Sequence, residues 1–187
     1  KFPNENGLRP IEQHFSKVKE LGLGKHALWL QPGSRFEQLH SPQTKLESDS
    51  FTIEAVTILD SIHKDASVNT LASRWNGNQS RSGWTFGVTS VKSRYQPRNF
   101  ILQLIGQNTG GSTIYEPIAS NLRIPTGKPV YLAASIQTRV NGKSTVTFHY
   151  ADLSESKSEL QSSTVSFQIA HGLQNPATKL LLGGRDQ

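Results

Sequence analysis

The stretch GWTFGVTSVKSRYQPRNFILQL, residues 83–104, contains two runs in which apolar and polar side chains alternate. The apolar positions are Trp84, Phe86 and Val88 in the first run and Phe100, Leu102 and Leu104 in the second. A period of two places one face of a segment in a core and the other in solvent, which is typical of antiparallel β-strands. The break between the runs contains Pro97 and predicts a loop.

The same alternation recurs along the chain, at residues 51–59, 145–150 and 164–169. Further strands are expected at residues 26–31, 35–40, 68–75, 129–137 and 179–183. Turn signals separate these runs, and Asn141-Gly142 between two apolar runs is the strongest hairpin signal. About ten short strands without intervening helices predict an all-β fold, either a two-sheet antiparallel sandwich or a closed barrel.

Only the first segment has a helical period. Ile11, Phe15, Val18 and Leu21 form one stripe of a helix, which Pro10 is suited to open. The sequence therefore predicts a short N-terminal helical extension or linker at residues 1–24, followed by one sandwich domain at residues 25–187. We expect the chain to be a piece of a longer or processed protein, because it has no initiating Met.

The charge of the chain is concentrated in one window. The 187 residues include 20 Lys+Arg and 14 Asp+Glu, which gives a net charge of +6. No acidic residue lies between Asp65 and Glu116, and the cations there are Arg74, Arg81, Lys92, Arg94 and Arg98. A basic window with interleaved aromatic residues indicates an acidic glycan or a nucleic acid as partner. The alternative is an ordinary core flanked by solvated charges.

The segment RWNGN at residues 74–78, followed by SGW at residues 82–84, is the most suggestive local cluster. A Trp ring can stack on a sugar, and Arg and Asn can hydrogen-bond its hydroxyl, sulfate or carboxylate groups. Alternatively, both Trp residues belong to the core and Asn-Gly is only a turn. The predicted ligand-binding residues are Arg74, Trp75, Asn76, Asn78, Trp84 and Arg98.

Signatures of catalysis and of metal binding are sparse. The chain has no Cys, which excludes disulfides and thiolate sites, and it lacks the nucleophile elbow, the phosphate loop and the zinc-protease motif. Glu47, Asp49 and Glu54 do not share one face of a straight strand, so they do not form a glycosidase pair there. No cofactor is expected; Asp60 and Asp186, at strand ends, are the candidates for a structural Ca²⁺ site.

In order and spacing, six pieces resemble the laminin-G-like branch of the concanavalin A-like lectin/glucanase superfamily. They are FTIEA (51–55), LASRW (71–75), GWTFGV (83–88), PVYLAASI (129–136), VTFHYAD (146–152) and LLLGG (180–184). More narrowly, WNG (75–77), GWTFGVTS (83–90), YQPRN (95–99) and GGRD (183–186) are similar to a module of large planctomycete exported proteins that also carry cytochrome c-type domains. The resemblance implies a jelly-roll sandwich outside the cytoplasm, in the periplasm, on the cell surface or secreted.

Together, these features predict a non-catalytic carbohydrate-binding or adhesion module of a larger secreted bacterial protein. An acidic polysaccharide is preferred to nucleic acid as partner, because no repeated base-stacking element is present. A scaffold that packs on neighbouring domains of the parent protein is the first alternative, and a glycoside hydrolase or lyase is the second. No membrane span is expected, since no apolar run approaches the roughly 20 residues that a bilayer requires.

Overall fold

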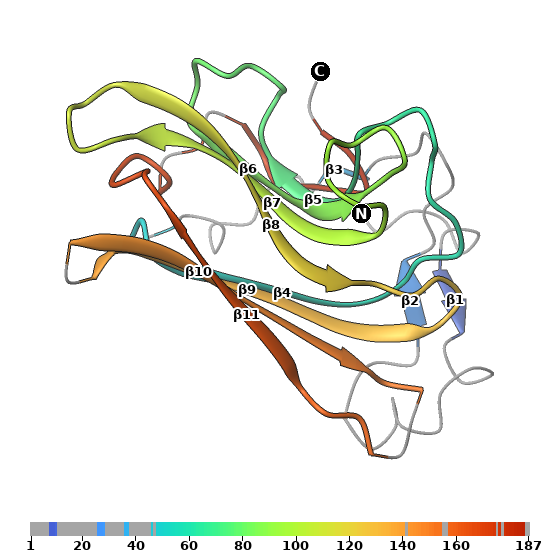
Figure 1. The fold of residues 1–187 in the computed structure, drawn as a ribbon. Coiled ribbons are helices and arrows are strands. Elements are labelled where there is room, and N and C mark those ends of the chain that lie inside the picture. Colours follow the sequence, from blue (N-terminus) through green and yellow to red (C-terminus); the bar gives the residue numbers. More distant parts are fainter. Residues whose placement is uncertain are drawn as a thin grey trace.

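Two antiparallel β-sheets face each other in the computed structural model of the chain (Figure 1). The structure describes residues 8–10, 26–28, 36–37, 46, 48–140, 142–154, 157–174, 176 and 178–185. Within these residues the regular elements are strands and none is a helix. The described part of the chain is therefore all-β, and its two sheets form a β-sandwich rather than a closed barrel.

The first sheet has four strands in the order β11-β10-β9-β4. These strands are β4 (Phe51–Ile58), β9 (Pro129–Val140), β10 (Lys143–Asp152) and β11 (Gln161–Phe167). Strands β9 and β10 form a hairpin, and Gly142 in its turn has a φ of 77°. That backbone conformation favours glycine, in agreement with the turn predicted at this point.

The second sheet has the order β3-β12-β5-β6-β7-β8. Its strands are β3 (Phe36–Glu37), β12 (Leu181–Leu182), β5 (Val68–Arg74), β6 (Gly83–Thr89), β7 (Asn99–Gln107) and β8 (Thr113–Arg123). A separate two-stranded ladder joins β1 (Leu8–Pro10) to β2 (His26–Leu28). The predicted helix around residues 11–21 lies outside the described residues.

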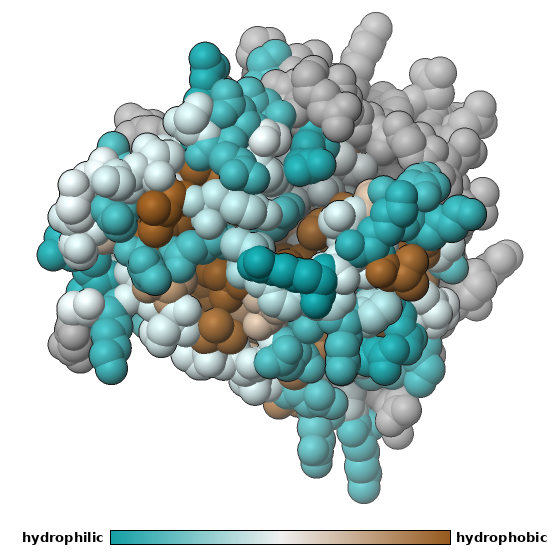
Figure 2. Space-filling model, turned by 45° about the horizontal axis from the view of Figure 1, so that its top comes forward, coloured by the Kyte–Doolittle hydropathy of each residue, from teal (hydrophilic) through white to brown (hydrophobic). Residues whose placement is uncertain are grey.

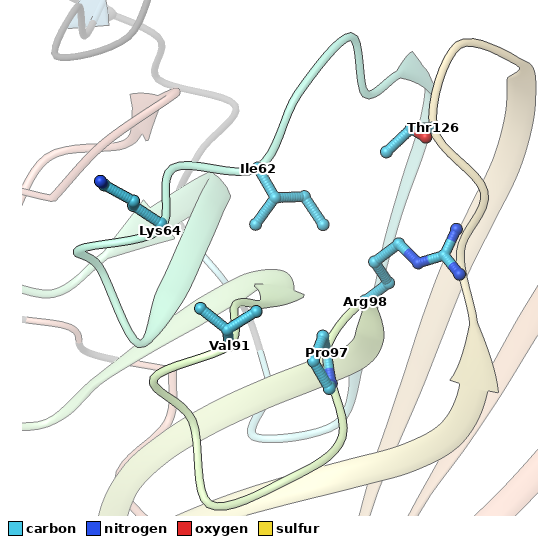
Figure 3. A pocket seen from close by; sticks show the side chains of 6 residues that line it. All are labelled: Ile62, Lys64, Val91, Pro97, Arg98 and Thr126. Atoms are coloured by element: carbon cyan, nitrogen blue, oxygen red, sulfur yellow. The ribbon is translucent and has the colours of Figure 1, made fainter.

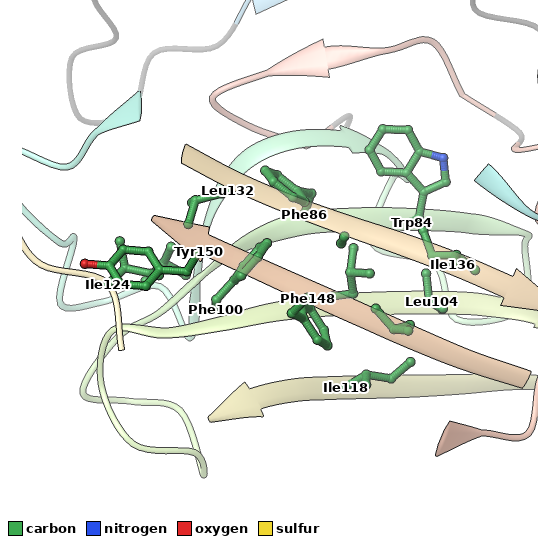
Figure 4. Close-up of a cluster of buried hydrophobic side chains, with 14 of the residues drawn as sticks. Trp84, Phe86, Phe100, Leu104, Ile118, Ile124, Leu132, Ile136, Phe148 and Tyr150 are labelled. Atoms are coloured by element: carbon green, nitrogen blue, oxygen red, sulfur yellow. The ribbon is translucent and has the colours of Figure 1, made fainter. Parts of the chain in front are cut away.

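The core fills the space between the two sheets (Figure 4). Phe86 and Phe100 come from the second sheet and Phe148 from the first, and all three are fully buried. Phe100 makes edge-on contacts with both other rings, at 5.0 Å between ring centroids in each case. Edge-to-face aromatic pairs are favourable beyond the area they bury, so this chain of rings ties one sheet to the other.

The strands predicted from alternation around residues 51–59, 83–88, 99–104, 145–150 and 164–169 are confirmed, apart from shifts at their ends. The expected solvent-facing side is wrong for β6 and β7, which are buried on both faces apart from Gln107. Strand β8 is a strand that the sequence did not predict. Pro117 interrupts its pattern, and proline cannot donate a hydrogen bond to a neighbouring strand. The structure accommodates Pro117 because β8 is the last strand of its sheet and pairs there with β7 alone.

None of the described residues forms a helix that is long and apolar enough to cross a membrane.

Candidate functional site

Trp75 is an interior residue of the structure. Its side chain is 3% exposed, and its ring stacks on Tyr115 at 5.7 Å between centroids with 24° between the planes. The guanidinium of Arg185 lies 5.1 Å from the ring centre, and the indole Nε1 donates to the backbone oxygen of Asn78 at 2.8 Å. A sugar stacks only on an accessible ring, so this environment favours the packing alternative for Trp75.

The polar residues beside Trp75 form hydrogen bonds within the protein, Arg74 to a distant loop and the two asparagines within the turn that joins β5 to β6. Arg74 is half-buried and its Nε donates to the backbone oxygen of Thr178 at 3.0 Å. Burial lowers the pKa of Arg74 from its ordinary value. Asn76 Oδ1 accepts from the Asn78 N–H at 3.0 Å, and Asn78 Oδ1 accepts from Ser80 N and Oγ at 2.8 and 2.7 Å. These bonds shape the turn itself.

Trp84 also belongs to the interior. It is 5% exposed and lies in the core cluster, with its ring centroid 6.1 Å from that of Phe51. Its position in phase with the other core residues of β6 agrees with the packing alternative.

The two described carboxylates among those considered for catalysis, Asp49 and Glu54, form separate contacts. Asp49 accepts from the backbone N–H groups of Gly172 at 3.1 Å and Gln174 at 2.7 Å. Glu54 is on the exposed outer face of β4, where the Tyr131 hydroxyl donates to it at 2.9 Å. Burial, the hydrogen bond and the charge of Glu54 raise the pKa of Tyr131. Glu47 lies outside the described residues.

Asp60, one of the two Ca²⁺ candidates, is exposed just after β4, and Asp186 lies outside the described residues. Within the described residues, no group of three or more His, Cys, Asp or Glu side chains is placed to hold a metal ion. A Ca²⁺ site at either position therefore stays a prediction.

Arg98, the remaining predicted residue, lies at the other end of β6 from the Arg74–Asn78 turn. Strand β6 has seven residues, which separates its two ends by about 20 Å. Arg98 lines a hollow of about 290 Å³ at this end of the sandwich. The lining residues are Ile62, Lys64, Val91, Pro97, Arg98 and Thr126. They come from the loops β4–β5, β6–β7 and β8–β9, so the fold assembles the hollow from three distant parts of the sequence.

The hollow combines apolar walls with positive charge. Ile62, Val91 and Pro97 lie between Lys64 on one side and Arg98 on the other (Figure 3). Val91 is 69% exposed, so its side chain is accessible to a ligand. In the part of the chain that the structure describes, neither the Lys64 ammonium nor the Arg98 guanidinium has a hydrogen-bond or ion-pair partner. Both cations are therefore available to an anionic ligand.

The backbone at Arg98 has the left-handed conformation, with a φ of 65°. Two hydrogen bonds hold it there: Arg98 N donates to Thr89 O at 2.9 Å, and Ile124 N donates to Arg98 O at 2.8 Å. For a residue with a Cβ atom this conformation costs about 1–2 kcal/mol relative to the right-handed one. An arginine at a position better suited to glycine is the kind of local strain that is found at functional sites.

The loop that carries Arg98 also holds two other cations of the basic window. Lys92 forms an exposed ion pair with Asp65 at 3.2 Å. Arg94 lies over the ring of Tyr95, 5.0 Å from its centre, and the Tyr95 hydroxyl donates to the backbone oxygen of Pro117 at 3.0 Å. The basic window is thus divided between the two ends of β6, and the unpaired charge at the hollow comes from Arg98 together with Lys64.

Comparison of the chain with protein-family models and with curated proteins finds no match. The candidate site therefore rests on the geometry of the hollow.

Proposed function

We propose that this chain is a non-catalytic carbohydrate-binding module that holds an acidic polysaccharide at the hollow between Lys64 and Arg98. The observation that carries the proposal is the pairing of apolar walls with two cations that have no partner among the described residues. The proposal includes a jelly-roll fold of the laminin-G-like type and a location outside the cytoplasm, as part of a larger exported protein. These two points are supported by the sequence resemblance.

An acidic sugar has apolar faces and an anionic edge, which match the apolar and the basic residues of the hollow. A sugar ring presents C–H groups on its faces, which can pack on Ile62, Val91 and Pro97, and carries polar groups at its edge. A carboxylate or sulfate on that edge can accept paired hydrogen bonds from the Arg98 guanidinium. Lys64 lies on the opposite side of the hollow with its ammonium turned outward, so it adds attraction at longer range (Figure 3). A hollow of about 290 Å³ is at the lower limit of ligand pockets, roughly 300–1,000 Å³, and suits one sugar unit.

The surface gives less support to a scaffold that packs on neighbouring domains. Such a scaffold requires a large continuous apolar surface. On the face seen in Figure 2, the hydrophobic areas are separated by hydrophilic side chains. The exposed large hydrophobic residues among those described are Val56, Ile58, Val91 and Leu160, and of these only Val56 and Ile58 share a strand.

A matched pair of variants tests the proposal. Val91→Asp places a carboxylate in the wall of the hollow, and we expect it to weaken binding to a polyuronate at least fivefold, through repulsion and lost apolar contact. Leu160→Asp makes the same change at a side chain that is 58% exposed, away from the hollow, and should retain wild-type binding. Affinity electrophoresis in gels that contain polygalacturonate, a sulfated polysaccharide or dextran measures the difference.

Both variants carry one negative charge more than the wild type, so a difference between them reports the position of the charge and not its amount. Binding of the wild type to the two acidic polymers should also fall steeply with added salt, as exposed ion pairs are screened. If the wild type binds none of the three polymers, or if both variants bind like the wild type, the proposed site is wrong.

A further inference from the structure

A second arginine, which is exposed, lies at the end of β8, beside the segment that carries Arg98. Arg123 ends β8, and in the antiparallel pair of β7 and β8 it stands opposite Asn99, the residue after Arg98. The hydrogen bond from Ile124 N to Arg98 O, at 2.8 Å, fixes the two segments side by side. Arg123 is exposed, and its guanidinium has no partner among the described residues. It is not among the residues that line the hollow.

The alternation along β8 gives the direction of the Arg123 side chain. Leu122 and Ile124 both pack on the core between the sheets. Successive side chains of a strand point to opposite faces, so Arg123 projects away from that core. Arg98, in contrast, lines the hollow. The two arginines therefore lie on neighbouring segments, Arg98 just before β7 and Arg123 at the end of β8.

The carboxylates on the loops beside the hollow do not neutralise this pair of arginines. Asp65 forms its ion pair with Lys92, and no acidic residue follows until Glu116. Glu116 accepts hydrogen bonds from Gln168 N and Ile169 N. Asp60 is exposed, and no ion pair joins it to either arginine. Within the part of the chain that the structure describes, neither Arg98 nor Arg123 therefore has a carboxylate at ion-pair distance.

We propose that the binding site continues from the hollow to Arg123, and that its ligand is a linear polysaccharide with an anionic group on successive sugar units. This inference rests on the proposed function and deepens it. Arg98, assisted by Lys64 at longer range, binds the anionic group of one sugar unit in the hollow. Arg123 lies beyond this unit, so its guanidinium can bind only the anionic group of a neighbouring unit. Carboxylates and sulfates share this chemistry, and the experiment separates them.

The test compares Arg123→Gln with Arg81→Gln. Arg81 is also exposed and lies in the turn before β6, at the end of the strand away from the hollow. Its guanidinium has no partner among the described residues, so both variants remove one unpaired charge. Isothermal titration follows the binding of galacturonic acid oligomers of one to six units, and of sulfated oligosaccharides of equal lengths, at several salt concentrations.

In the wild type we expect the affinity to rise when a second and third unit are added. Arg123→Gln should lower the affinity for oligomers of two or more units about tenfold and leave the monomer unchanged. It should also reduce the slope of log affinity against log salt by about one, the signature of one lost anion contact. Arg81→Gln should match the wild type at every length. The preferred series of oligomers identifies carboxylate or sulfate as the recognised group.

Two results would overturn the inference. If Arg123→Gln and Arg81→Gln bind all lengths equally, the site ends at the hollow, and the proposed function still stands as long as Val91→Asp weakens binding. If no oligosaccharide of either series binds to the wild type, both the polysaccharide assignment and the proposed function fail.

Discussion

Trp75→Ala is expected to lower the free energy of unfolding by about 3–5 kcal/mol, and to leave the binding of acidic oligosaccharides unchanged in the molecules that stay folded. Trp75 is 3% exposed, so the variant opens a cavity where the indole ring now packs on Tyr115. It also removes the donor to the backbone oxygen of Asn78, which lies 2.8 Å from the indole nitrogen. The hollow at the other end of β6 is not part of this contact network.

Urea unfolding, followed by circular dichroism, measures the loss of stability, and titration well below the unfolding midpoint measures binding. Trp75→Phe is the matched variant, because it keeps an aromatic ring beside Tyr115 and loses the hydrogen bond. It should cost less than Trp75→Ala. The opposite pattern, in which stability is nearly unchanged and binding is lost in Trp75→Ala, would mean that the indole ring stacks on the sugar as the sequence first indicated.

The interior position of Trp75 shows what alternation can and cannot predict. Strand β6 has a regular period, and the interior positions of Trp84 and Phe86 follow from it. Trp75 follows the last residue of β5, where the period gives no direction. Its ring partner, Tyr115, belongs to β8, a strand that the sequence did not predict because Pro117 interrupts its pattern. The packing of Trp75 therefore depends on a strand pairing that local pattern does not contain.

For the candidate site, the sequence predicted one of the basic residues, Arg98, but not the other residues that line the hollow with it. Arg98 was predicted as part of an acid-free window, and it does line the hollow. Lys64 and Thr126 come from loops far away in the sequence, and no motif connects them to Arg98. The sequence also grouped Arg98 with Arg74, although β6 holds them at opposite ends. Counting charges along the sequence groups residues that are close in the chain. The directions of the strands determine which of those residues lie close together in the structure.

Arg98→Gly is expected to separate stability from binding. Glycine adopts the left-handed conformation at φ 65° without the steric cost that arginine carries there, about 1–2 kcal/mol. The greater freedom of glycine in the unfolded chain offsets part of this gain. We therefore expect the free energy of unfolding to stay unchanged or to rise by up to about 1 kcal/mol. Binding of an acidic oligosaccharide should fall tenfold or more, because the guanidinium is removed.

Arg139→Gly is the matched control for this variant. Arg139 also has a left-handed backbone, with a φ of 53°, and it lies at the end of β9, outside the set of residues that line the hollow. Its side chain shares a 3.2 Å hydrogen bond with His171 Nε2, so its gain in stability should be the smaller one. Because both variants lose one arginine, only the position differs between them. If Arg139→Gly weakens binding as much as Arg98→Gly, net charge governs the interaction. If Arg98→Gly is strongly destabilised, then arginine at this position stabilises the loop, and its strained backbone is not evidence of a binding role.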